Sequence, residues 1–174
     1  MIEKIINNYS LSIYENKFEL FYELSNLLES EINQSLKLKE RYHFCICGGS
    51  TPKSVYEMLS KKQLFWDKVD LFLGDERCVS PKSEESNSLM IRDSLLKDYG
   101  SKASFYEIFN EGEINEEFSK KNYINYLRAK CAGDPPVMDL TLLGLGDDGH
   151  TASLFPYKSN NDSDDLVIFS YGKG

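Results

Sequence analysis

The sequence predicts an α/β fold in which a mainly parallel sheet is covered by helices on both faces. Candidate strands alternate with candidate helices along the chain, and this alternation is typical of parallel sheets. Three of the candidate strands end in glycine-containing loops, and these loops carry the polar residues that are candidates for a functional site. With 174 residues, of which 41% are hydrophobic, the chain is long enough to form one domain with a buried core.

The first part of the chain predicts a long helix, a strand and a second helix. Residues from Asn16 to about Leu38 form the first helix, because apolar residues recur at i, i+4, i+7, i+8 and i+12 on one face. That stripe consists of Leu20, Leu24, Leu27, Leu28 and Ile32. A strand is expected from Tyr42 to Cys47. The helix that follows runs from Pro52 to about Lys61, and Ser50 or Thr51 can cap it.

The rest of the chain continues the alternation of strands and helices. Short apolar runs bounded by turn residues predict strands, and apolar residues at helical spacing predict helices. The expected strands are Val69–Leu73, Phe105–Phe109, Met138–Leu143 and Asp165–Ser170. The expected helices are Ser86–Lys97 and Glu116–Lys130.

Composition excludes several classes of partner. The formal net charge of −8 argues against nucleic acid, since binding to a phosphate backbone needs a basic face. No apolar run approaches the roughly 18 residues that span a bilayer, and the first residues lack the pattern of a signal peptide. We therefore expect a soluble, cytoplasmic protein with reduced cysteines and no membrane partner. No metal site is expected, because His43 and Cys47 would lie about 13 Å apart on one strand.

The strand that ends at Cys47 leads into Gly48-Gly49-Ser50-Thr51-Pro52. Glycines let the backbone approach an anion, and the N–H groups of a helix N-terminus can donate hydrogen bonds to it together with the two hydroxyls. The segment lacks the lysine of a Walker loop and the spacing of a dinucleotide-binding motif. It therefore favours a phosphate on a sugar over a nucleotide. The alternative is a tight turn with an ordinary helix cap.

A second loop, Gly74-Asp75-Glu76-Arg77, follows the strand Val69–Leu73. The guanidinium of Arg77 can donate two parallel hydrogen bonds, so Arg77 is a candidate phosphate ligand. Alternatively, Arg77 pairs with Asp75 or Glu76 and only holds the loop. Because the carboxyl ends of parallel strands lie at one edge of a sheet, we expect this loop to lie near the first.

The most informative loop is Gly144-Leu-Gly-Asp-Asp-Gly-His150, at the end of the strand Met138–Leu143. Imidazole is the side chain whose ordinary pKa lies nearest to neutrality, so His150 is a candidate general base if it faces the pocket. Asp148 can hold the imidazole in the required tautomer or bind a hydroxyl of the substrate. Such a pair suits lactone or ester hydrolysis by an activated water, and no Gly-x-Ser-x-Gly motif indicates a serine nucleophile. The alternative is a surface loop in which His150 is incidental.

Together these motifs resemble those of the 6-phosphogluconolactonase family. The matching segments, in the family's order, are Gly-Gly-Ser-Thr-Pro (48–52), Gly-Asp-Glu-Arg-Cys-Val (74–79), Ser-Asn (86–87) and Gly-Leu-Gly-Asp-Asp-Gly-His-Thr-Ala-Ser-Leu-Phe-Pro (144–156). The resemblance implies hydrolysis of 6-phosphoglucono-1,5-lactone to 6-phosphogluconate, in the oxidative pentose phosphate pathway, without a cofactor. It also implies a three-layer, Rossmann-like fold shared with glucosamine-6-phosphate deaminase and ribose-5-phosphate isomerase.

The resemblance also assigns roles to individual residues. His150 becomes the general base and Asp148 its partner. The contacts to the sugar phosphate fall on Gly48, Gly49, Ser50, Thr51 and Arg77. Family members usually continue for several dozen residues more, so residues 1–174 are expected to form a single domain without its C-terminal strands and helix. Lys173 stands near the position of a phosphate-binding cation in that segment, and the roles of Asp75 and Asn87 stay open.

The expected ligand is a small sugar phosphate. The composition resembles that of apicomplexan proteins, in which such a domain is fused to glucose-6-phosphate dehydrogenase, so fusion to or action beside that enzyme is expected. Two alternatives remain, namely a glucosamine-6-phosphate deaminase/isomerase and a catalytically silent sugar-phosphate-binding module. The deaminase family has Met-Asp-Glu-Tyr in place of Gly-Asp-Glu-Arg and Gly-His-Ile-Ala-Phe-Asn in place of Gly-His-Thr-Ala-Ser-Leu, and both differences favour the lactonase.

Overall fold

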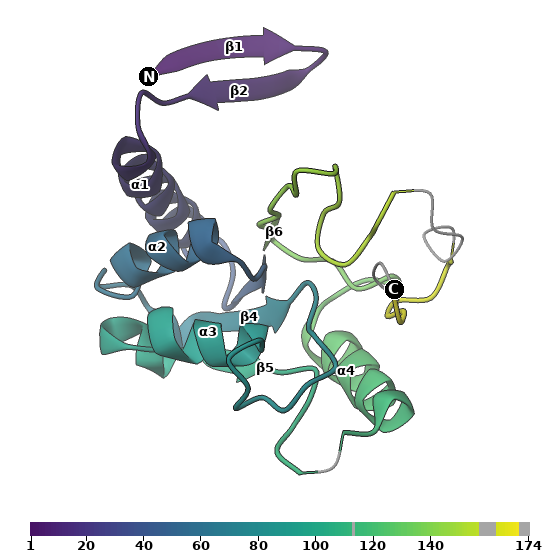
Figure 1. The fold of residues 1–174 in the computed structure, drawn as a ribbon. Coiled ribbons are helices and arrows are strands. Elements are labelled where there is room, and N and C mark those ends of the chain that lie inside the picture. The colour runs from purple at the N-terminus through teal and green to yellow at the C-terminus, as the bar shows by residue number, and fades with distance from the viewer. Residues whose placement is uncertain (113, 157–162, 171–174) are drawn as a thin grey trace.

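A four-stranded parallel sheet forms the centre of the molecule, in the order β5-β4-β3-β6 (Figure 1). A computed structural model of the chain describes residues 1–112, 114–156 and 163–170. The four strands are β3 (Tyr42–Ile46), β4 (Val69–Leu73), β5 (Ser104–Tyr106) and β6 (Leu140–Thr141). Because all four run parallel, their carboxyl ends share one edge, and the loops that follow them gather there.

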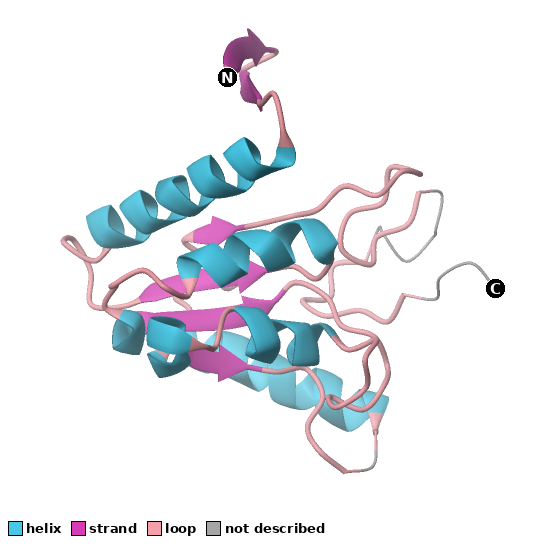
Figure 2. Ribbon diagram, turned by 60° about the vertical axis from the view of Figure 1, so that its left-hand side comes forward, coloured by secondary structure: helices cyan, strands magenta, loops and turns pink. Residues whose placement is uncertain are grey.

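Helices cover both faces of this sheet (Figure 2). One face carries α1 (Lys17–Ser35), α2 (Ser50–Leu59) and α3 (Asn87–Ser94), and the other carries α4 (Glu116–Lys130). Two short 3-10 helices, η1 (Trp66–Lys68) and η2 (Asp98–Lys102), precede β4 and β5. This arrangement confirms the predicted α/β class. None of the described helices is both long and apolar enough to cross a membrane.

The core is divided between the two faces by the alternation of side chains along the strands. In β4 every residue is buried; Val69, Leu71 and Leu73 pack towards the core that α1, α2 and α3 share. Phe72 points the other way and packs with Tyr123 and Leu127 of α4. A strand buried on both faces is typical of the middle of a parallel sheet, and its rigidity fixes the starting points of the site loops.

Helix boundaries follow local capping. The Asn16 side chain accepts a hydrogen bond from the N–H of Glu19 (2.9 Å) and begins α1, and Asn115 does the same for Phe118 (2.9 Å) at the start of α4. The predicted bounds of β4 and α4 are confirmed. The predicted third helix is too long, because α3 ends at Ser94 rather than Lys97.

Three strand predictions need correction. β6 contains only Leu140 and Thr141 because these are the residues that pair with β3, at Phe44 and Cys45. β5 spans Ser104–Tyr106 rather than Phe105–Phe109. The strand predicted from Asp165 to Ser170 is wrong, since residues 163–170 form neither helix nor strand. Their apolar pattern has no described strand beside it to supply backbone hydrogen bonds.

An antiparallel hairpin, formed by β1 (Ile2–Ile6) and β2 (Tyr9–Ile13), precedes α1 and projects away from the sheet (Figure 1). All of its strand residues are exposed. Asn7 and Asn8 form the turn with positive φ angles of 48° and 70°, a conformation that asparagine tolerates better than most residues. The sequence prediction did not include this hairpin, although an Asn-Asn pair between two alternating runs was a signal for it.

Candidate functional site

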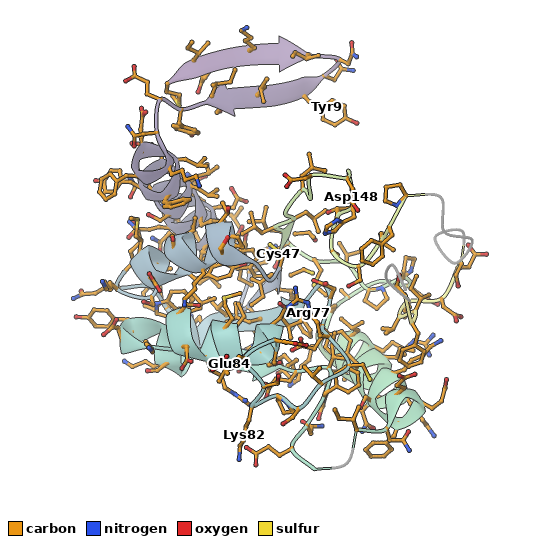
Figure 3. The ribbon with its side chains drawn as sticks, viewed as in Figure 1. Tyr9, Cys47, Arg77, Lys82, Glu84 and Asp148 are labelled. Atoms are coloured by element: carbon orange, nitrogen blue, oxygen red, sulfur yellow. The ribbon has the colours of Figure 1, made fainter. Side chains whose placement is uncertain are left out.

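The loops after β3, β4 and β6 surround a cavity of about 450 Å³ at the carboxyl edge of the sheet. Figure 3 shows Cys47, at the end of β3, between Arg77 on one loop and Asp148 on another. Six of the predicted site residues line this cavity, namely Gly48, Gly49, Ser50, Thr51, Arg77 and His150. The structure therefore brings together loops that are about 100 residues apart in sequence, from residue 48 to residue 150.

His150 and Asp148 form a hydrogen-bonded pair within the third loop. Nδ1 of His150 lies 2.5 Å from Oδ1 of Asp148, and the same oxygen accepts a hydrogen bond from the His150 N–H at 3.2 Å. Gly149 lies between them with φ +85°, a backbone conformation that favours glycine. The hydrogen bond from the imidazole lowers the pKa of Asp148, which therefore stays ionised. Since Nδ1 is engaged, Nε2 is the ring nitrogen available to a ligand or water.

The imidazole of His150 lies over Gly146. A Cβ atom at position 146 would lie 2.2 Å from Cε1 of the ring, so no side chain fits there while His150 keeps its place. The loop closes on itself through the Gly146 N–H, which donates to the His150 carbonyl at 2.8 Å, and through the Thr151 hydroxyl, which donates to the Gly144 carbonyl at 2.9 Å. These contacts hold the imidazole at the wall of the cavity.

The first loop leaves the N-terminus of α2 open towards the cavity. The expected cap on this helix is wrong, because α2 begins at Ser50 and its N-cap is Gly49, which has φ +112° and no side chain to offer. The side chains of Ser50 and Thr51 are thereby exposed at the cavity rather than used as caps. A helix N-terminus has N–H groups without partners inside the helix, so this wall suits an anion.

Arg77 is braced by a backbone carbonyl rather than by a carboxylate. Its Nη1 donates to the carbonyl oxygen of Glu85 at 2.7 Å, and in the described part of the chain it forms no ion pair with Asp75 or Glu76. Glu76 instead accepts hydrogen bonds from the N–H groups of Asn87 and Ser88, both at 2.8 Å, at the start of α3. The guanidinium charge therefore remains available to an anion in the cavity.

Two cavity residues whose roles the sequence left open make specific contacts. Asp75 accepts a hydrogen bond from the Ser153 hydroxyl (Oγ to Oδ2, 2.6 Å), and the Asn87 side chain donates to the Asp75 carbonyl at 3.0 Å. Asp75 and Asn87 stand in motifs that resemble the family's, and this drew attention to them. No local pattern indicated that Ser153, 78 residues from Asp75, is its hydrogen-bond partner. Lys173, the predicted cation, lies outside the described residues.

Comparison with known proteins places the chain in a family. The family described as "Glucosamine-6-phosphate isomerases/6-phosphogluconolactonase" matches residues 15–173. The chain belongs to this family. Among similar proteins, a 6-phosphogluconolactonase from a Nostoc species is 34% identical over 161 residues, which cover 84% of this chain and 67% of that protein. One from Rhizobium meliloti is 34% identical over 147 residues and is covered to 61%.

Solved structures of the family have the same fold. The 6-phosphogluconolactonase of Shewanella baltica matches with a TM-score of 0.75 and 28% identity, over 84% of this chain and 61% of that one. The enzyme from Trypanosoma brucei matches with a TM-score of 0.74 and 28% identity, over 88% and 66%. The chain thus spans about three fifths to two thirds of the length of these family members.

Proposed function

We propose that this chain hydrolyses 6-phosphoglucono-1,5-lactone to 6-phosphogluconate. The observation that carries the proposal is the pairing of His150 with Asp148 at the wall of a cavity that also receives the N-terminus of α2 and the guanidinium of Arg77. One side of the cavity suits a phosphate and another carries a base. The names of the similar proteins support the same reaction.

In the proposed reaction, the phosphate of the lactone binds to the N–H groups and hydroxyls of Ser50 and Thr51 and to Arg77. Asp148 stays ionised and accepts a hydrogen bond from Nδ1–H of His150, so that Nε2 can take a proton from a water as the water attacks C1 of the lactone, which leaves His150 as an imidazolium. The tetrahedral intermediate then breaks the bond between C1 and the ring oxygen. That oxygen receives the proton from the imidazolium, and the open-chain acid is released.

We extend the proposal to the whole protein in two respects. Residues 1–174 belong to a single lactonase domain, since they match 61% of the length of the Rhizobium meliloti protein. Lys173 is a further cation for the phosphate in this proposal. The protein acts in the cytoplasm, beside or fused to glucose-6-phosphate dehydrogenase. That partnership is supported by chemistry, since oxidation of glucose 6-phosphate supplies the lactone.

The proposal is tested by assaying freshly generated lactone with the wild-type chain and with His150→Ala. We expect kcat to fall by ~10²–10⁴-fold, the usual contribution of a general base. His43→Gln, which changes the other histidine of the chain, is the matched control and should keep wild-type kcat. If His150→Ala were as active as the wild-type chain, His150 would not be the general base.

Two further outcomes would replace the proposal. An inactive wild-type chain that still binds 6-phosphogluconate would be a silent binding module. Release of ammonia from glucosamine 6-phosphate would identify a deaminase on the same fold.

A further inference from the structure

The three loops around the cavity are joined by a continuous line of contacts. Ser153, in the loop of His150, donates its hydroxyl hydrogen bond to the carboxylate of Asp75 at 2.6 Å. The amide of Asn87 donates to the backbone carbonyl of Asp75 at 3.0 Å. The same amide packs against Gly48, where a Cβ atom would lie only 1.9 Å from its oxygen. The line therefore runs from the His150 loop, through Asp75 and Asn87, to the loop at Gly48. We call residues 48–52 the phosphate-facing loop, after the role proposed for them above.

Asn87, which joins Asp75 to the loop at Gly48, is held rigidly. Asn87 is the first residue of α3 and is only 2% exposed. Its backbone N–H is held by the carboxylate of Glu76 at 2.8 Å. Asp75 follows β4, the fully buried strand, two residues after its end, so both Asp75 and Asn87 are anchored to the core.

The other end of the line is a strained loop that depends on its surroundings. Ala152 has φ +49°, a left-handed conformation that residues with a Cβ rarely adopt and that persists only where neighbouring contacts hold it. Leu154 donates its N–H to the Thr151 carbonyl at 2.9 Å, which forms a tight turn around Ala152 and Ser153. The hydrogen bond from Ser153 to Asp75 ties this turn to the loop that follows β4.

We propose that Asp75 and Ser153 are positioning residues, which fix the distance between His150 and the phosphate-facing loop. The inference rests on the lactonase activity proposed above. A base and a phosphate site act on one substrate only if their separation matches it, and a displacement of about 1 Å can cost on the order of 10²-fold in rate. The bond between Asp75 and Ser153 links the His150 loop to the loop after β4, and Asn87 continues the link to the loop at Gly48.

The test uses Ser153→Ala, because Ser153 is not among the residues that line the cavity of His150. We expect kcat to fall by roughly 10- to 100-fold while KM changes by less than about threefold. Ser153→Thr keeps a hydroxyl and should recover most of the activity. Ser94→Ala is the matched control, since Ser94 is 1% exposed and its hydroxyl donates to the Met90 carbonyl within α3, away from the cavity.

A second readout does not depend on activity. The chain has two histidines, so the imidazole signals of His150 and His43 can be separated by NMR. In Ser153→Ala the His150 signal should shift or broaden, while the His43 signal stays in place; Ser94→Ala should move neither. If Ser153→Ala keeps wild-type kcat, or if its His150 signal is unchanged, the inference is wrong. A wild-type chain without lactonase activity would overturn the proposed function alone, and the His150 signal would then decide the positioning role.

Discussion

Gly146 lies beneath the imidazole of His150, so the absence of a side chain there is part of the site geometry. The residue needs no unusual backbone angle, in contrast to Gly149 with φ +85°. Its role is one of space, because the ring of His150 occupies the volume that a Cβ atom would fill. His150 and the glycine beneath its ring therefore form one unit.

Gly146→Ala should displace the imidazole, because the new Cβ atom would meet two ring atoms at 2.2 and 2.3 Å. We expect kcat to fall by at least about 10-fold, since a displaced base loses its alignment with the attacked carbon. Thermal unfolding should show little change. Gly144→Ala is the comparison, because a Cβ atom there meets nothing within 4 Å, and it should cost less than about threefold. Equal activity of the two variants would contradict this prediction.

Arg77→Ala should chiefly weaken binding. On the proposed phosphate contact, removal of the guanidinium is expected to raise KM by about 10-fold or more, with a smaller effect on kcat. Arg77→Lys should fall between, because an ammonium keeps the charge but not the two parallel donors. Calorimetry with 6-phosphogluconate measures the affinity directly. An unchanged affinity together with a lower melting temperature would mean that Arg77 only braces the loop through Glu85.

At the level of elements, the start of α3 is held by a carboxylate from the preceding loop. Glu76 accepts hydrogen bonds from two N–H groups of the first turn and from the Ser86 hydroxyl at 3.0 Å. An anion at a helix N-terminus is stabilised both by these donors and by the helix dipole. Glu76 thereby fixes α3, and with it Asn87, against the site.

Glu76→Ala should lower the free energy of unfolding by about 2 kcal/mol, since hydrogen bonds to a charged acceptor at a helix start are lost. Urea denaturation measures this value. Glu84, in the exposed part of the same connection, offers the matched control (Figure 3). Glu84→Ala should leave stability within about 0.5 kcal/mol of wild type. A similar loss in both variants would exclude the capping role of Glu76.

The elements differ in how well the sequence predicted them. The strand Val69–Leu73 and the helix Glu116–Lys130 have the predicted bounds, because an apolar run and a capped helix are specified by neighbouring residues. The strand expected at Asp165–Ser170 is wrong, because an apolar pattern becomes a strand only where another strand pairs with it. The hairpin β1–β2 was not predicted, because its apolar residues do not face a core.

At the scale of the whole molecule, several thiol and phenol groups are buried or half-buried. Burial raises the pKa of the Cys45 thiol and of the Cys131 thiol, each to about 11. It also raises the pKa of the Tyr56 and Tyr123 phenols well above their ordinary value. The folded chain thus holds protons that the unfolded chain would release in alkaline solution.

Stability should therefore fall as pH rises from about 9 to 11. In that range the unfolded state binds fewer protons than the folded state, so the free energy of unfolding decreases, with a slope of up to about 1.4 kcal/mol per pH unit for each such group. Urea denaturation at pH 8 and pH 10.5 measures the loss. Replacing Cys45 and Cys131 by alanine should reduce it. A wild-type stability that is constant over this range would contradict the prediction.

The sequence by itself determined the alternation of strands and helices, the chemistry of the three strand-end loops, the family, and the pairing of Asp148 with His150. Each of these depends on residues that are close in sequence or on motifs read in order. Only the tertiary structure decided that Ser153 binds Asp75, that Asn87 packs on Gly48 and that Glu76 caps α3. The physical reason is the order of the parallel strands, since β4, β3 and β6 lie side by side and bring their distant loops into contact at one edge.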